Sequence, residues 1–193
     1  LSPDLDAAMV DEALRTLNGG FAGVGELAAY HDGWTRDNLA RLDPVCRLSR
    51  EKGTPVLIHV NEPVGHVYPG KINVDAAGLV DMIAAHPNTT FILAHWGGGL
   101  MFYALMPEIK KVFANTYFDT AASPFLYSSD VFDIALRTAG ADRIVFGTDY
   151  PLLGRRRYDM QLDEAGIKSP DREKILGGNM DGLLERGRRD GKE

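Results

Sequence analysis

The chain has 193 residues, and 21 lysine and arginine residues against 27 aspartate and glutamate residues give it a formal net charge of −6 at pH 7. This acidic balance argues against nucleic acid or a membrane surface as the main partner, because both favour a basic patch. A single cysteine, Cys46, excludes an intramolecular disulfide and a multi-cysteine metal site. We expect a globular, cytoplasmic protein, since no apolar run is long enough for a membrane span and no secretion signal is recognisable.

Short apolar runs alternate along the chain with longer amphipathic segments, which is typical of βα units around a parallel sheet. Ser2 is the predicted N-cap of a first helix that ends at 18–20. The predicted strands are, in chain order, 21–27, 55–60, 90–95, 116–119 and 143–148. The predicted later helices are 37–52, 75–85, 101–113, 129–139, 158–165, 169–177 and 180–188. We therefore predict one α/β domain over residues 1–193, with five parallel strands.

Each predicted strand carries an ionisable side chain at or near its carboxyl end. These residues are Glu26, His59, His95, Asp119 and Asp149. In barrels and open parallel sheets alike, active sites lie where strands end and βα loops begin. Imidazole nitrogens and carboxylate oxygens suit a divalent metal, with Zn²⁺ first and Mn²⁺ or Fe²⁺ as alternatives. The pattern therefore predicts a metal site at one rim of the sheet.

Two of these residues are the predicted catalytic groups. A strand-end aspartate such as Asp149 can hold a metal and accept the proton of an attacking water. A histidine on a neighbouring strand, here His95, can polarise a carbonyl group or transfer a proton.

Ordinary structural explanations compete with these roles. His59 could be a buried histidine bonded to a backbone carbonyl, and Glu26 could belong to an ion pair with a lysine or arginine. Asp119 before a threonine could cap a turn, and Asp149 could cap its own loop.

Four further residues are predicted to contact a small-molecule substrate. His31 and His66 belong to loops at the rim, and Trp96 and Tyr150 directly follow the strand-end His95 and Asp149. The glycines of the run 97–99 lack both phosphate-loop spacings, so we expect them to let the backbone pass close to the metal site.

Several sequence motifs resemble the later half of the amidohydrolase superfamily, and the closest branch is the amidohydrolase-2 group with the aminocarboxymuconate-semialdehyde decarboxylase-like enzymes. They are PVLIHV, FILAHWGGG, YFDTA, FGTDYP and ILGGN. The resemblance implies a distorted (β/α)₈ TIM barrel of the metal-dependent hydrolase type. His59 and His95 would match the histidines of strands five and six, and Asp149 the aspartate of strand eight. Glu26 would fall at the end of strand four, where TatD-like nucleases have a metal-ligand glutamate. The implied ligand set is therefore His59, Asp149, Glu26 and His95.

The family's His-x-His pair at the end of strand one has no counterpart among the five histidines. A (β/α)₈ barrel usually needs about 250 residues. We therefore predict an N-terminally incomplete barrel that lacks the first three βα units. Open sheet edges favour association, including homo-oligomers.

The resemblance implies a hydrolase that uses metal-activated water on an ester, lactone or amide-like bond of a small organic acid. A metal-dependent decarboxylase of the same fold is the first alternative, with a carboxylic acid as substrate. An inactive fragment or pseudo-enzyme is the second. A flavodoxin-like or response-regulator-like sheet also has five strands, but gives the strand-end histidines no role.

Overall fold

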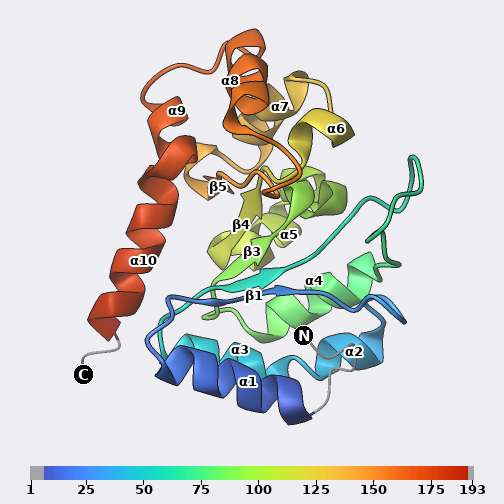
Figure 1. Ribbon diagram of the computed structural model, residues 1–193, viewed down its shortest axis with the longest axis vertical. Helices are drawn as coiled ribbons and strands as arrows, with labels where there is room; N and C mark the ends of the chain where they lie inside the picture. The colour runs from blue at the N-terminus through green and yellow to red at the C-terminus, as the bar shows by residue number, and fades with distance from the viewer. Residues whose placement is uncertain (1–6, 191–193) are drawn as a thin grey trace.

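A computed structural model describes residues 7–190 and contains a five-stranded, wholly parallel sheet (Figure 1). The strands are β1 (Val24–Leu27), β2 (Val56–Ile58), β3 (Phe91–Leu93), β4 (Thr116–Asp119) and β5 (Ile144–Val145). They pair in chain order, β1-β2-β3-β4-β5. This order is that of a (β/α) barrel, whereas a flavodoxin-like sheet follows 2-1-3-4-5. The expected five parallel strands are confirmed, and the flavodoxin-like alternative is wrong.

Helices surround the sheet, with α1 to α3 grouped at one end, α6 to α8 at the other and α10 along one side (Figure 1). The α-helices are α1 (Ala7–Asn18), α2 (Arg36–Ala40), α3 (Asp43–Glu51), α4 (Ala76–Ala85), α5 (Pro107–Val112), α6 (Ser123–Leu126), α7 (Asp130–Thr138), α8 (Arg155–Glu164), α9 (Asp171–Glu173) and α10 (Asn179–Asp190). Shorter 3₁₀ or π segments are η1 (His95–Leu105), η2 (Phe113–Asn115), η3 (Ala141–Arg143) and η4 (Lys174–Gly178). None of the described helices is long and apolar enough to cross a membrane.

Both faces of β3 and β4 are buried. Ile58, Leu93 and their neighbours on one face join the large core formed with the helices. Ile92 and Val145 point the opposite way and pack with Leu183 of α10. Burial on both faces explains why the strands consist of nearly continuous apolar runs.

Two predicted helices are divided. The predicted helix 37–52 breaks between α2 and α3, and Pro44 occupies the first turn of α3. The predicted helix 101–113 is interrupted at Met106, and α5 begins at Pro107, because proline lacks the N–H that would continue the earlier helix. A left-handed turn precedes this segment. Ser2, the predicted first cap, lies outside the described residues.

The long loop between β2 and α4 extends away from the sheet and is closed by its own side chains (Figure 1). The Asn61 amide donates to the carbonyl of Ile72 at 2.9 Å and accepts from the Ile72 N–H at 2.8 Å. Lys71 Nζ donates to the carbonyls of Val64 at 2.5 Å and His66 at 3.2 Å. These bonds hold the loop against the end of β2, where the strand-end histidine lies.

The chemistry of Cys46 provides a test of this packing. Burial and the charge of Asp43 raise the pKa of the Cys46 thiol from 9.0 to about 12. We expect the native protein at pH 8 to react with a disulfide reagent at least about 100-fold more slowly than the protein unfolded in guanidinium chloride. Because the unfolded thiol ionises near pH 9 and the folded thiol does not, this residue should also favour unfolding as the pH rises above 9. Absorbance kinetics give the rate, and an equally fast native reaction would contradict the buried position.

Candidate metal centre and its pocket

Three of the predicted residues meet at the carboxyl ends of β1, β2 and β3. Potential ligand atoms of Glu26, His59 and His95 all lie within 4.8 Å of one another. Glu26 Oε1 is 2.7 Å from His59 Nδ1 and 3.7 Å from His95 Nε2. The two imidazole rings are edge to face, with centroids 5.0 Å apart. We call these three residues the Glu–His–His cluster.

Backbone carbonyls orient both histidines. His59 Nε2 lies 3.1 Å from the carbonyl oxygen of Gly70, and His95 Nδ1 lies 3.0 Å from that of Ala121. A carbonyl only accepts, so these nitrogens carry hydrogens, and His59 Nδ1 and His95 Nε2 are turned toward Glu26. A hydrogen on His59 Nδ1 is donated to the carboxylate, and a bound cation would take the place of that hydrogen. Metal-bound histidines are held in this way. Two imidazole nitrogens and one carboxylate therefore fit a divalent metal ion.

The environment of Glu26 keeps its carboxylate charged. Burial raises the pKa of Glu26, but the hydrogen bond to His59 and the charges of His59 and His95 outweigh burial, so the net pKa is lowered. Glu26 thus pairs with two histidines, and not with a lysine or arginine as the structural explanation of this residue expects. A charged carboxylate is the form that binds a cation.

Asp119 caps a turn, as its structural explanation proposes. Its Oδ1 accepts from the backbone N–H groups of His95 at 3.1 Å and Ala121 at 2.7 Å. A side chain at Gly147 would collide with this carboxylate, so the glycine permits the close approach of the next strand end. Burial raises the pKa of Asp119, although the two N–H groups and the charge of His95 lower it. Asp119 thus supports the backbone around His95.

Asp149 lies in the wall of the same pocket, outside the Glu–His–His cluster. Its backbone is left-handed, with φ of 58°. Burial raises the pKa values of Tyr30 and Tyr68, and the negative charge of Asp149 raises them further. Asp149 is therefore separated from the cluster but acts electrostatically on the same cavity.

The cavity has a volume of about 520 Å³, and its walls contain aromatic residues that sequence reasoning missed. The Tyr30 ring centroid is 6.0 Å from that of His59, and the Tyr68 ring centroid is 5.4 Å from that of His66. Burial and the charges of Glu62 and Asp149 raise the pKa of Tyr68 to about 12. The lining residues are Glu26, Tyr30, His59, His66, Tyr68, Pro69, Gly70, His95, Ala122, Phe125, Leu126, Asp149 and Leu152. The only sequence signal for either tyrosine is its closeness to a histidine in a rim loop.

Three of the four predicted substrate contacts lie elsewhere. Trp96 is completely buried, donates to Ser123 Oγ at 2.9 Å and packs edge-on against Phe132, so it belongs to the core. His31 and Tyr150 are exposed and do not line the cavity. His66 is the one predicted substrate contact in its wall.

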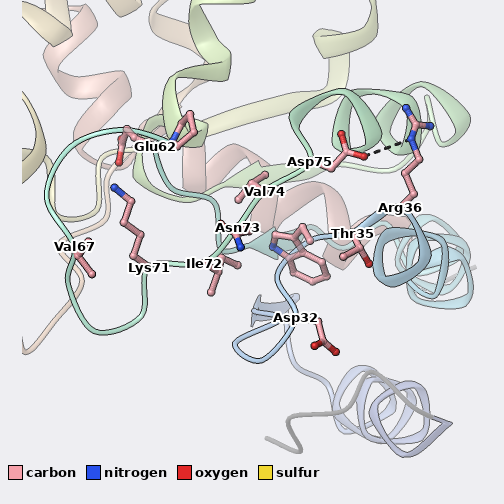
Figure 2. Close-up of a pocket in the computed structure, with 12 residues that line it drawn as sticks. Asp32, Thr35, Arg36, Glu62, Val67, Lys71, Ile72, Asn73, Val74 and Asp75 are labelled. Atoms are coloured by element: carbon pink, nitrogen blue, oxygen red, sulfur yellow. Dashed lines mark ion pairs between the residues drawn. The ribbon is translucent and has the colours of Figure 1, made fainter.

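A second cavity of about 620 Å³ is lined by residues of the β2–α4 loop and by residues 32 and 34–36 (Figure 2). Figure 2 shows Lys71 pointing toward Glu62 at one end and the ion pair of Arg36 with Asp75 at the other, where Arg36 Nε is 3.4 Å from Asp75 Oδ2. The residues of the Glu–His–His cluster do not line it. The larger cavity is therefore distinct from the candidate metal centre.

Solved structures with a similar fold include several decarboxylases. The 5-carboxyvanillate decarboxylase from Sphingomonas paucimobilis matches with a TM-score of 0.70 and 16% identity, over 95% of this chain and 64% of that chain. A dihydroxybenzoic acid decarboxylase from Polaromonas, solved with manganese and the inhibitor 2-nitroresorcinol, matches with a TM-score of 0.67 and 20% identity, over 98% and 68%. An uncharacterised TIM-barrel protein from Bordetella bronchiseptica matches with a TM-score of 0.69 and 23% identity, over 93% and 62%. The chain thus spans about two thirds of the length of each.

The comparison with curated proteins gives no match. The family described as Amidohydrolase, Amidohydro_2, matches residues 1–180. Together with the sequential parallel sheet, this match confirms the resemblance inferred from the strand-end motifs. The chain belongs to the amidohydrolase family.

Proposed function

We propose that this protein is a divalent-metal-dependent enzyme that removes the carboxyl group of a small aromatic acid. The observation that carries the proposal is the Glu–His–His cluster in a cavity of about 520 Å³ that also contains Asp149. Tyr30, Tyr68 and Phe125 give that cavity aromatic walls suited to a planar ring. The decarboxylases with a similar fold add support, because their names include substituted benzoic acids.

Glu26, His59 and His95 would hold the metal. A bound divalent ion would supply the positive charge that attracts the substrate carboxylate. Tyr68, whose pKa is raised to about 12 by burial and by the charges of Glu62 and Asp149, stays protonated at neutral pH and would donate a hydrogen bond to the substrate.

Decarboxylation breaks the bond between the ring carbon and the carboxylate, so the electron pair stays on the ring carbon and carbon dioxide leaves. A proton must then replace the carboxyl group. Asp149 would take up a proton from water and deliver it to this carbon. His95 would act through the metal that it holds, because its Nδ1 faces the carbonyl of Ala121 and its Nε2 faces the cluster. The position of Asp149 outside the cluster supports proton transfer as its role in place of metal ligation.

The hydrolase interpretation of the sequence uses the same residues, with Asp149 accepting a proton from water. We favour decarboxylation because the similar structures named above include two decarboxylases. The two reactions leave different products, so one assay separates them.

Metal binding is the first test. We expect the chain to bind stoichiometric Mn²⁺ or Zn²⁺, and His59→Ala to weaken binding by more than the roughly 10- to 100-fold that loss of an outer-shell partner costs. The control is His86→Ala, because His86 lies at the end of α4 and pairs with Asp43 at 3.4 Å. Metal content by mass spectrometry and titration calorimetry give the result. No stoichiometric metal, or equal binding by both variants, would count against the cluster as a metal centre.

The reaction is the second test. With hydroxybenzoic acids as substrates we expect one carbon dioxide released for each ring product, and Asp149→Asn to lower kcat/KM by at least about 100-fold. Asp133→Asn is a matched control, since Asp133 pairs only with exposed Arg137 on α7 among the described ion pairs. Hydrolysis of esters or lactones with ¹⁸O from water incorporated, and no carbon dioxide from the acids, would support the hydrolase alternative.

A further inference from the structure

Tyr158 of α8 has a completely buried side chain that ends in a polar hydroxyl group. This hydroxyl donates to the carbonyl of Thr148 at 3.1 Å. Burial raises the pKa of the Tyr158 phenol, and the nearby backbone N–H of Ala122 partly opposes this rise. A buried hydroxyl needs a partner, and here the partner belongs to the loop that follows β5.

The two loops next to the Tyr158 hydroxyl carry parts of the candidate site. Thr148 directly precedes Asp149, which lies in the cavity wall. Ala122 directly follows Ala121, whose carbonyl holds the His95 ring at 3.0 Å. The Tyr158 hydroxyl is therefore bonded to the loop that carries Asp149 and lies near the loop that orients His95.

Both loops have a backbone conformation that needs support from their surroundings. Ala122 has φ of 56° and Asp149 has φ of 58°, in the left-handed region that residues other than glycine rarely adopt. On its other side, the carbonyl of Asp149 accepts from the N–H of Leu152 at 2.8 Å. Tyr158 and Leu152 thus fix the peptide groups on both sides of Asp149.

Two sets of contacts would still hold this part of the fold if the Tyr158 hydroxyl were removed. The ring packs edge-on against Phe146, with centroids 5.3 Å apart. Thr120 Oγ1 donates to the Gly147 carbonyl at 2.9 Å and accepts from its N–H at 3.1 Å, so β4 and β5 stay joined. Removing the hydroxyl alone should therefore loosen the Asp149 loop and leave the fold intact.

We propose that Tyr158 is a positioning residue that fixes the Asp149 carboxylate relative to His95. The proposal rests on the proposed function, in which Asp149 delivers a proton to the substrate and His95 holds the metal. Tyr158 does not line the cavity, so it would act through Asp149 and not by touching the substrate.

The direct test is Tyr158→Phe in the full chain, assayed on the acid that releases carbon dioxide. We expect kcat to fall about 10- to 100-fold, because small displacements of a catalytic group have effects of this size, with KM within about threefold and metal content unchanged. Tyr117→Phe is the matched control: it also removes a phenol hydroxyl, which accepts from Arg186 at 2.9 Å on the α10 side of the sheet. A wild-type kcat for Tyr158→Phe would overturn the proposal.

A double-mutant cycle separates positioning from general loss of stability. If Tyr158 acts through Asp149, the combination of Tyr158→Phe with Asp149→Asn should be no slower than Asp149→Asn alone. Fully additive losses would show that Tyr158 acts elsewhere and would overturn the proposal.

Hydrogen exchange provides a readout that does not depend on activity. We expect Tyr158→Phe to exchange amides in 147–153 about five- to tenfold faster than the wild type, and Tyr117→Phe to leave them unchanged. Unchanged exchange in Tyr158→Phe would overturn the positioning role. Faster exchange in a protein that shows no activity in any form would reject the proposed function and support the positioning role.

Discussion

Parallel pairing of strands in chain order is the constraint on which the candidate site depends. Leu27 pairs with Ile58, and Ile58 with Leu93, so the carboxyl ends of the first three strands lie side by side. The cluster residues nevertheless stand at different heights: Glu26 one residue before its paired leucine, His59 one after Ile58, and His95 two after Leu93. An irregular register in β1 and the left-handed backbone of His95, with φ of 54°, bring their side chains together. The sheet provides the edge, and local departures from ideal strand geometry assemble the cluster.

The loops complete what the strands begin, because backbone carbonyls from two loops orient the imidazole rings. The Gly70 carbonyl comes from the β2–α4 loop, whose base is closed by the reciprocal bonds of Asn61 with Ile72. The Ala121 carbonyl is held through the carboxylate of Asp119. Rigid support of this kind reduces the reorganisation that metal binding requires. The cluster thus stands at the ends of the strands, and the aromatic residues of the wall come from the loops.

Much of this arrangement could be predicted from the sequence, because strand ends in a parallel sheet converge whatever the loops do. The five strands and the ionisable residues at their ends are visible as apolar runs that terminate in glutamate, histidine or aspartate. The loops could not be predicted in the same way. Trp96 follows His95 directly, which suggested a place in the cavity. The backbone turns left-handed at 95–99, and the indole of Trp96 is buried in the core. Tyr30 and Tyr68 line the cavity only because two separate loops fold over His59.

The sequence by itself determined the class of fold, the family and the residue types available for a metal site. Hydrophobic periodicity and strand-end chemistry are local properties, and both are readable along the chain. Only the tertiary structure decided that Glu26, His59 and His95 form a cluster while Asp149 stays in the wall. The direction of a side chain after a strand depends on one or two backbone dihedral angles. Here those angles are set by hydrogen bonds between distant residues, such as that from Tyr158 to Thr148, which no local pattern encodes.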